Sequence, residues 1–423
     1  MKNKLGFWSI VLLGINSIIG SGIFLLPNKA YSLVGVGSIF VILFDMILVL
    51  SIALCFAEAS GMFKKNGGPY VYAKEAFGEF VGFEVGFMKW AIAIIAWAAM
   101  AAGFVQALSD VWAPAQDPIV KNTIISILII GLGIINILGV KVSKILNNII
   151  TLGKLIPLII FIAIGIFFIK GDNFVPFNFL NSTEKMNFAP AALLMFYAFT
   201  GFESIAVAAE DMNNPEKDLP IATIAVMLIV SIFYILILIV SIGVLGKDLS
   251  ISLTPIAQAA GNFMGETGAI LITAGTLISI GGINIAASFV TPRCGVALAE
   301  DGILPRVIAK NGRFGTPTTA IIITVILALL IAISGSFVKL AAISVISRFV
   351  QYLPTCLAIP VLRKKRPDLA RTFKVPLGPV IPIFAIVVSC WLVYNSDMEK
   401  ILIGLGGLIL GVPIYFFMKK YSK

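Results

Sequence analysis

The chain of 423 residues is 59% hydrophobic and only 12% charged, with a mean hydropathy of +1.04. Soluble domains carry about 25% charged residues, so the composition excludes an ordinary soluble protein and indicates a membrane protein. The sequence has no histidine, which excludes histidine metal sites and histidine proton relays. The formal charge of +10 does not indicate a nucleic-acid partner, because Lys and Arg concentrate in alternate loops, the positive-inside pattern of membrane proteins.

Apolar segments predict an all-α integral membrane protein with about twelve spanning helices. Each segment is long enough to cross a hydrocarbon core of ~30 Å as a helix, and the short alternating segments of a transmembrane barrel do not occur. An even number of spans agrees with a multi-pass protein of the cytoplasmic membrane whose two termini are cytoplasmic. We expect residues 249–264 to form a short helix over the outer mouth. The spans are expected near 7–33, 36–62, 80–111, 121–139, 146–169, 187–209, 219–245, 266–297, 318–335, 337–361, 379–395 and 400–418.

The first span is interrupted near its middle. In the stretch INSIIGSGIFLLP, Gly20 and Gly22 flank Ser21, and each glycine weakens a helix by roughly 1 kcal/mol. Glycine also serves close packing in membrane helices, so this motif alone leaves a packing role open.

The sixth span has a matching interruption, YAFTGFES, at Tyr197–Ser204. Discontinuous helices in corresponding halves of a chain are the best sequence indication of a transporter site. The offset of five spans predicts two five-helix repeats, approximately 1–170 and 187–361, within a transporter core of residues 1–361. Residues 362–423 would then form a cytoplasmic loop and two appended membrane helices.

Unwound backbone is tolerated in a membrane only where it lines a cavity or is buried in protein. Amides at the start of the outer half of span one carry the positive end of a helix dipole and suit a carboxylate. Carbonyls that end the first half of span six suit an ammonium group, so the two breaks together would hold a free α-amino acid. The amides belong to Ser21, Gly22 and Ile23, and the carbonyls to Ala198, Phe199 and Thr200, with Gly201 directly after them.

Four stretches of the chain resemble the amino acid–polyamine–organocation superfamily of transporters. They are SIIGSGIFLLP, GGPYVYAKEAFG, AFTGFESIAVAAEDMNNPEKDLPIA and VALAEDGILP, and they occur in the order typical of that superfamily. The resemblance implies a five-plus-five inverted repeat with discontinuous helices 1 and 6, and movement of amino acids or their amines by alternating access. It also implies that Gly20, Ser21 and Gly22 contact the substrate carboxylate, and that Ala198, Phe199 and Thr200 contact its amine.

Lys154 lies in the inner part of the fifth span, where ionisable residues are costly and usually functional. A lysine in such surroundings releases its proton readily, because desolvation penalises the ammonium form. The resemblance implies that Lys154 bridges helices one and eight and couples transport to protons, with Ser288 as a partner. A lysine that snorkels to the cytoplasmic face is the alternative, and relatives with this lysine include exchangers without proton coupling.

Glu203 follows the second break and resembles the helix-six glutamate that links the unwound segment to neighbouring helices. A hydrogen-bonding role and a pH-sensing role are both open. Asp45, Lys89 and Arg348 are the other intramembrane charges, and Asp45 could pair with either cation. Acidic residues at inner helix ends are expected to be solvated or paired with loops: Glu58, Glu210 and Asp211.

Side chains beyond the backbone clamp select the substrate. In arginine-exchanging relatives the position of Trp97 is a polar asparagine, whereas here it is a large apolar ring. No acidic residue is obviously placed to meet a second positive group, so we expect a neutral substrate, with an apolar or aromatic side chain favoured. The resemblance places around it Tyr197 and Phe202 of span six, Ala93, Trp97 and Met100 of span three, and Ile283 of span eight.

The sequence therefore predicts a secondary transporter of neutral amino acids, proton-coupled or exchanging, and not an enzyme. An exchanger of an amino acid for its decarboxylated amine is the alternative. No selectivity-filter motif, metal-ligand cluster or GxxxxGK[ST] nucleotide loop occurs in the sequence, so we expect no cofactor, no metal and no ATP-driven step. The expected partners are an amino acid and membrane lipid, with the chain a monomer or a homodimer.

Overall fold

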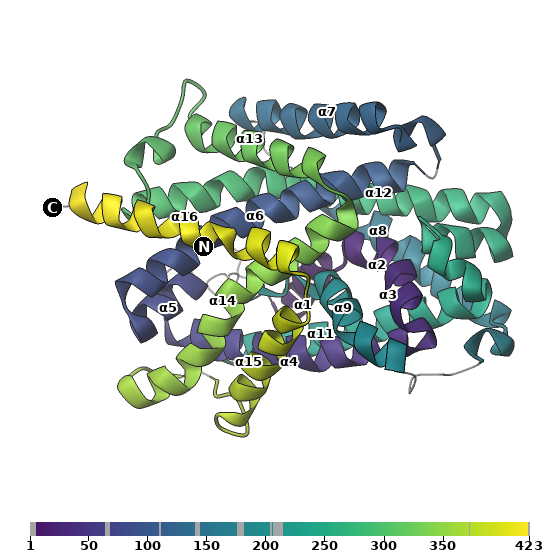
Figure 1. Ribbon diagram of the computed structural model, residues 1–423, viewed down its shortest axis with the longest axis horizontal. Coiled ribbons are helices and arrows are strands. Elements are labelled where there is room, and N and C mark those ends of the chain that lie inside the picture. The colour runs from purple at the N-terminus through teal and green to yellow at the C-terminus, as the bar shows by residue number, and fades with distance from the viewer. Residues whose placement is uncertain are drawn as a thin grey trace.

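The computed structural model describes residues 6–63, 68–109, 111–139, 144–175, 182–203, 205, 215–371 and 373–421. These residues form α-helices joined by short turns, with no strand in the described part of the chain (Figure 1). The helices are α1 Phe7–Ile18, α2 Ser21–Leu25, α3 Pro27–Val34, α4 Ser38–Met62, α5 Pro69–Phe77, α6 Glu79–Leu108, α7 Pro118–Ile137, α8 Lys144–Gly165, α9 Ser182–Phe199, α11 Pro215–Leu245, α12 Pro255–Glu300, α13 Thr318–Ser334, α14 Phe337–Lys365, α15 Val380–Tyr394 and α16 Met398–Tyr421.

The first expected span holds α1, α2 and α3, and each of the other eleven coincides with one helix as far as it is described, which confirms the all-α membrane fold. Eight apolar helical stretches of the described chain are long enough to cross a membrane, and four more are shorter. Two of the short ones are Phe7–Ile18 and Asn187–Phe199, which belong to spans one and six. The expected interruptions therefore shorten these two spans.

Local sequence sets where several helices begin and turn. Asp117 caps α7, since its carboxylate accepts hydrogen bonds from the N–H groups of Ile119 at 2.8 Å and Val120 at 3.1 Å. Gly265, with φ of 68°, bends α12 after its first ten residues. The leg before this bend corresponds to the short outer helix expected within 249–264, although it begins only at Pro255.

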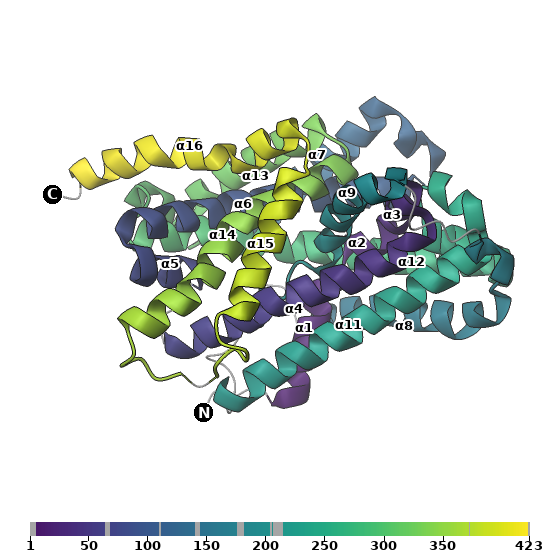
Figure 2. The ribbon, with the colours of Figure 1, turned by 60° about the horizontal axis from the view of Figure 1, so that its bottom comes forward.

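Burial divides the bundle into a centre and a periphery. In the apolar stretch of α6, 67% of the residues are buried, against 17% for α7 and 11% for α16. α11 lies along α4 in the central bundle (Figure 2). α15 and α16 pack against α14 from outside, and also contact α4 and α6 respectively. The two appended helices thus lie at the periphery, while the broken spans lie inside the bundle.

Candidate functional site

The first break separates α1 from α2. The N–H of Ile19 closes the last turn of α1 by donating to Ile15, and the chain then extends through Gly20, with φ of −144° and ψ of −151°. Helical hydrogen bonding resumes at Ser21, and α2 continues into α3 through bonds such as Leu26 N–H to Gly22 O at 2.9 Å. The break frees the last carbonyls of α1 and the first amides of α2 from helical partners.

The second break follows α9 at Phe199. Thr200 turns the chain, since both its N–H, at 3.1 Å, and its hydroxyl, at 2.8 Å, donate to Tyr197 O. Gly201 has φ of 111°, a conformation that side-chain-bearing residues rarely adopt. The break predicted in YAFTGFES is confirmed as far as Glu203, and residues 204 and 206–214, which hold Glu210 and Asp211, lie outside the described part of the chain.

The two breaks face each other directly. A methyl group on Gly22 would lie 2.6 Å from Ala198 Cα and 3.0 Å from Ala198 N, so α2 touches the backbone of α9 here. On the other side, a methyl group on Gly201 would collide with the carbonyl oxygen of Ser17 in the last turn of α1. The structure therefore brings the predicted amide segment and the predicted carbonyl segment together in the protein interior, where Ser21 is 3% and Ala198 2% exposed.

Lys154 of α8 binds the end of α1. Its ammonium Nζ donates to Asn16 O at 2.6 Å and to Ile19 O at 2.8 Å, and the residue is 1% exposed. The side chain thus satisfies two carbonyls freed by the first break, and it does not snorkel to the membrane surface.

Ser288 of α12, the expected partner of Lys154, makes other contacts. Its hydroxyl donates to Ile285 O at 2.7 Å, and its carbonyl accepts from Asn136 Nδ2 at 2.7 Å. Among the described contacts, the structure does not join Ser288 to Lys154.

Tyr234 of α11 joins the two breaks. Its fully buried hydroxyl lies 2.8 Å from Ala198 O and 3.4 Å from Ile18 O, so the shorter bond goes to α9. Ala198 O has a second lone pair and remains able to accept from an ammonium group. This tyrosine was missed from the sequence, where the only signal was a single phenol within a long apolar run, SIFYILILIV.

Glu203 ties the second break to α14. One carboxylate oxygen is paired with Arg348, and the other accepts from the N–H of Gly201 at 3.0 Å and the hydroxyl of Tyr352 at 3.2 Å. These bonds fit the hydrogen-bonding role that the sequence left open.

Of the other intramembrane charges, Arg348 is accounted for by Glu203 and not by Asp45. Asp45 is fully buried, and neither of its oxygens has a hydrogen-bond partner among the described residues.

Side chains on α6, α9 and α12 border the breaks. Ile283 lies against Gly20, where a methyl group would be 2.6 Å from Ile283 Cδ1. The hydroxyls of Ser21 and Tyr197 are 3.3 Å apart, and the ring of Tyr197 packs edge-on against Phe337.

The expected residues of α6 differ in burial. Asn284 Nδ2 donates to Met100 O at 3.1 Å, which places Met100 on the face of α6 toward α12. Trp97, one turn earlier, is fully buried, while Ala93 and Met100 are half-buried. Phe202 is buried too, and its ring packs against Phe56 and Tyr352.

A second polar cluster joins helix ends at the side of the bundle predicted to be cytoplasmic. Glu58, at the end of α4, is fully buried and accepts two bonds from Arg363, at 2.8 and 2.5 Å, and one from Val375 N–H at 2.6 Å. Glu58 is therefore paired with the loop after α14, one of the two outcomes expected for it.

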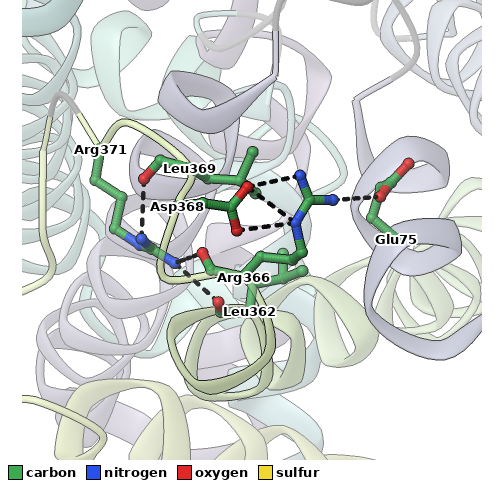
Figure 3. Close-up of polar contacts among 6 residues, drawn as sticks. All are labelled: Glu75, Leu362, Arg366, Asp368, Leu369 and Arg371. Atoms are coloured by element: carbon green, nitrogen blue, oxygen red, sulfur yellow. Dashed lines mark hydrogen bonds and ion pairs between the residues drawn. The ribbon is translucent and has the colours of Figure 1, made fainter.

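Arg366 and Arg371 organise the same loop (Figure 3). Arg366 binds Asp368 and reaches Glu75 of α5 at 3.5 Å, and its hydrogen bond lowers the pKa of Asp368. Arg371 donates to the carbonyls of Leu362, Arg366 and Leu369. The loop is thus fastened to α4, α5 and α14 together.

An all-helical bundle with two facing helix breaks in its interior defines a membrane transporter. The chain belongs to the amino acid permease family, because the sequence model of that family matches residues 5–413. It is therefore a multi-pass membrane transporter of amino acids, and not an enzyme.

Characterised and uncharacterised relatives match over almost the whole chain. An uncharacterized transporter of Mycobacterium tuberculosis is 35% identical, over 98% of this chain and 91% of the relative. The serine/threonine exchanger SteT of Bacillus subtilis is 32% identical, over 99% of this chain and 98% of the exchanger. The branched-chain amino acid permease BcaP of the same organism is 30% identical, over 100% of this chain and 94% of the permease.

Proposed function

We propose that this protein is a secondary transporter that moves neutral amino acids across the cytoplasmic membrane by alternating access. The substrate carboxylate would bind the amides of Ser21, Gly22 and Ile23, and its ammonium group the carbonyls of Ala198, Phe199 and Thr200. The observation that carries this proposal is the contact between Gly22 and Ala198, which sets the two breaks against each other without a side chain between them.

A zwitterion suits this arrangement because the amide and carbonyl segments carry no side-chain charge, and the charge of Glu203 beside the second break is paired with Arg348. The dipole at the start of α2 favours a negative group, and freed carbonyls favour a positive one. Glu203 and Lys154 are both engaged, by Arg348 and by α1 carbonyls respectively. A net charge on the substrate would thus lack a partner, which favours a neutral amino acid.

Lys154 supports a proposal for coupling. As an ammonium group it holds the carbonyls of Asn16 and Ile19, and loss of its proton would weaken both bonds. Because Asn16 and Ile19 lie in the last turn before Gly20, the protonation of Lys154 would be linked to the position of the first break. A proton-coupled mechanism follows if this link changes with substrate binding.

Two buried polar atoms favour a hydroxyl-bearing substrate, in place of the apolar or aromatic side chain that the sequence favoured. Trp97 Nε1 is a donor and Asn284 Oδ1 an acceptor, and neither has a partner among the described residues. Both residues lie where α6 meets α12, next to Met100. A serine or threonine side chain would satisfy such a donor and acceptor, and SteT is named as a serine/threonine exchanger.

We also propose the remaining architecture from the sequence. The core would consist of two inverted repeats, approximately 1–170 and 187–361, followed by the appended segment 362–423. Both termini would be cytoplasmic, which follows from the distribution of Lys and Arg.

Transport by purified protein in proteoliposomes tests the proposal. We expect uptake of a labelled neutral amino acid, screened over the twenty common amino acids, and competition by serine or threonine. Accumulation into empty vesicles under an imposed pH gradient would support proton coupling. Strict dependence on internal amino acid would identify an exchanger, and dependence on internal amine would identify the precursor/product alternative. Failure of every amino acid to be taken up or exchanged would refute the proposal.

A further inference from the structure

A small cavity lies at the end of the bundle that carries the C-terminus. Figures 1 and 2 both place α5 and the last turns of α16 at this end. The cavity has a volume of about 280 Å³, slightly below the range of roughly 300–1,000 Å³ for common small-molecule pockets. It is lined by Tyr70 and Lys74 of α5, Glu79 and Phe83 of α6, Asp301, Gly302 and Ile303 after α12, and Tyr415, Met418 and Lys419 of α16.

Aromatic side chains place this cavity at the boundary between membrane and water. The ring of Tyr415 packs against the rings of three phenylalanines. The distances between ring centroids are 5.1 Å to Phe80, 5.2 Å to Phe83 and 5.5 Å to Phe416. Phe416 is 61% exposed on the outside of the bundle. Tyrosine is enriched at the level of lipid headgroups, and Tyr70 and Tyr415 line the cavity beside exposed charged side chains, so a ligand of the cavity would meet acyl chains on one side and water on the other.

The cavity presents two charges of each sign. Lys74 and Lys419 are positive, and Glu79 and Asp301 are negative. None of the four forms an ion pair with another described residue. Lys419 instead lies over the ring of Tyr415, with Nζ 5.7 Å from its centroid.

The four charged side chains are exposed, while the backbone that carries Lys74 is closely packed. A methyl group on Gly82 would lie 2.6 Å from Lys74 Cβ, so α5 is packed closely on α6 beneath this lysine. The phenol of Tyr70 is affected by the negative charges of the cavity. Burial raises its pKa most, and the charges of Asp301 and Glu79 raise it further. Both carboxylates line the same cavity as Tyr70.

We infer that this cavity binds the headgroup of phosphatidylethanolamine. The phosphate would contact Lys74 and Lys419, and the primary ammonium group would contact Asp301 and Glu79. A balanced set of charges disfavours a purely anionic headgroup, and carboxylates can accept hydrogen bonds from a primary ammonium but not from the quaternary ammonium of phosphatidylcholine.

Lipid competition on the purified full-length protein tests this inference. The protein would be reconstituted in nanodiscs of phosphatidylethanolamine, phosphatidylcholine and phosphatidylglycerol in equal amounts, and retained lipids would be counted by native mass spectrometry. We expect phosphatidylethanolamine to be retained roughly tenfold over either other lipid, the ratio that corresponds to one charge-assisted hydrogen bond. Equal retention of the three lipids, or preference for phosphatidylglycerol, would overturn the inference.

Variants identify the cavity as the origin of the preference. Lys74→Gln combined with Lys419→Gln should abolish it, and Asp301→Asn should shift it toward phosphatidylglycerol because the cavity becomes net positive. Lys420→Gln is the matched control, since this exposed neighbour does not line the cavity, and it should leave the preference unchanged. An unchanged preference in the double variant and in Asp301→Asn would contradict the assignment. Thermal unfolding of each variant in detergent shows that the fold is retained.

Discussion

Replacement of Gly22 by alanine should separate the two breaks. The added methyl carbon would lie 2.6 Å from Ala198 Cα, 2.8 Å from Ala198 Cβ and 3.0 Å from Ala198 N. Two of these three atoms are backbone atoms within α9, so no side chain can rotate away. The strain must be relieved by moving α2 away from α9, and overpacking of this kind costs about 1–3 kcal/mol.

The expected loss of affinity follows from this cost. If the whole cost falls on the substrate-bound state, the affinity for the amino acid falls roughly 5- to 150-fold. Binding of a labelled amino acid to purified variant and parent protein measures the ratio directly.

A second glycine provides a matched control. Gly406 lies within α16, and a methyl group there meets nothing within 4 Å. Gly406→Ala should therefore leave affinity unchanged and stabilise the helix slightly. Parent-like affinity of Gly22→Ala would refute the reasoning that substrate binds where α2 meets α9.

Contacts around the breaks and in the Glu58 cluster give further predictions. Lys154→Ala should abolish accumulation driven by a pH gradient while exchange across the membrane is retained, and unchanged accumulation in proteoliposomes would exclude this lysine from coupling. Tyr234→Phe leaves Ala198 O without its donor and should weaken substrate binding or thermal stability by about 1–3 kcal/mol, whereas no change in either would show that the 2.8 Å bond is dispensable. Glu58→Gln removes the charge that faces Arg363 and should lower the unfolding temperature in detergent, with parent-like unfolding as the contrary result.

The helix breaks were predictable because their residues conflict with the surrounding pattern. Gly20, Ser21 and Gly201 are poor choices for an apolar spanning helix, and the structure places irregular backbone at Gly20 and Gly201, with a new helix beginning at Ser21. Lys154 was noticeable for the same reason, since a charge within lipid requires an explanation.

The partners of these residues were not predictable, because they depend on packing between distant segments. Arg348 meets Glu203 from 145 positions away, and one sequence does not show which of several buried charges will pair. Tyr234 carries no local pattern, since a tyrosine in an apolar span usually packs as a hydrophobic side chain. Ser288 was chosen from its position on span eight, and the rotation of α12 directs its hydroxyl to Ile285 O instead.

The central claim is that one zwitterion is held between the two breaks by both of its charges. Binding of a transported amino acid, its decarboxylated amine and its deaminated acid to the purified protein tests this claim most directly. Each analogue loses at least one charge-assisted interaction of about 1.5–3 kcal/mol, so we predict that both bind at least roughly tenfold more weakly than the amino acid. Equal binding of the amino acid and either analogue would contradict the claim.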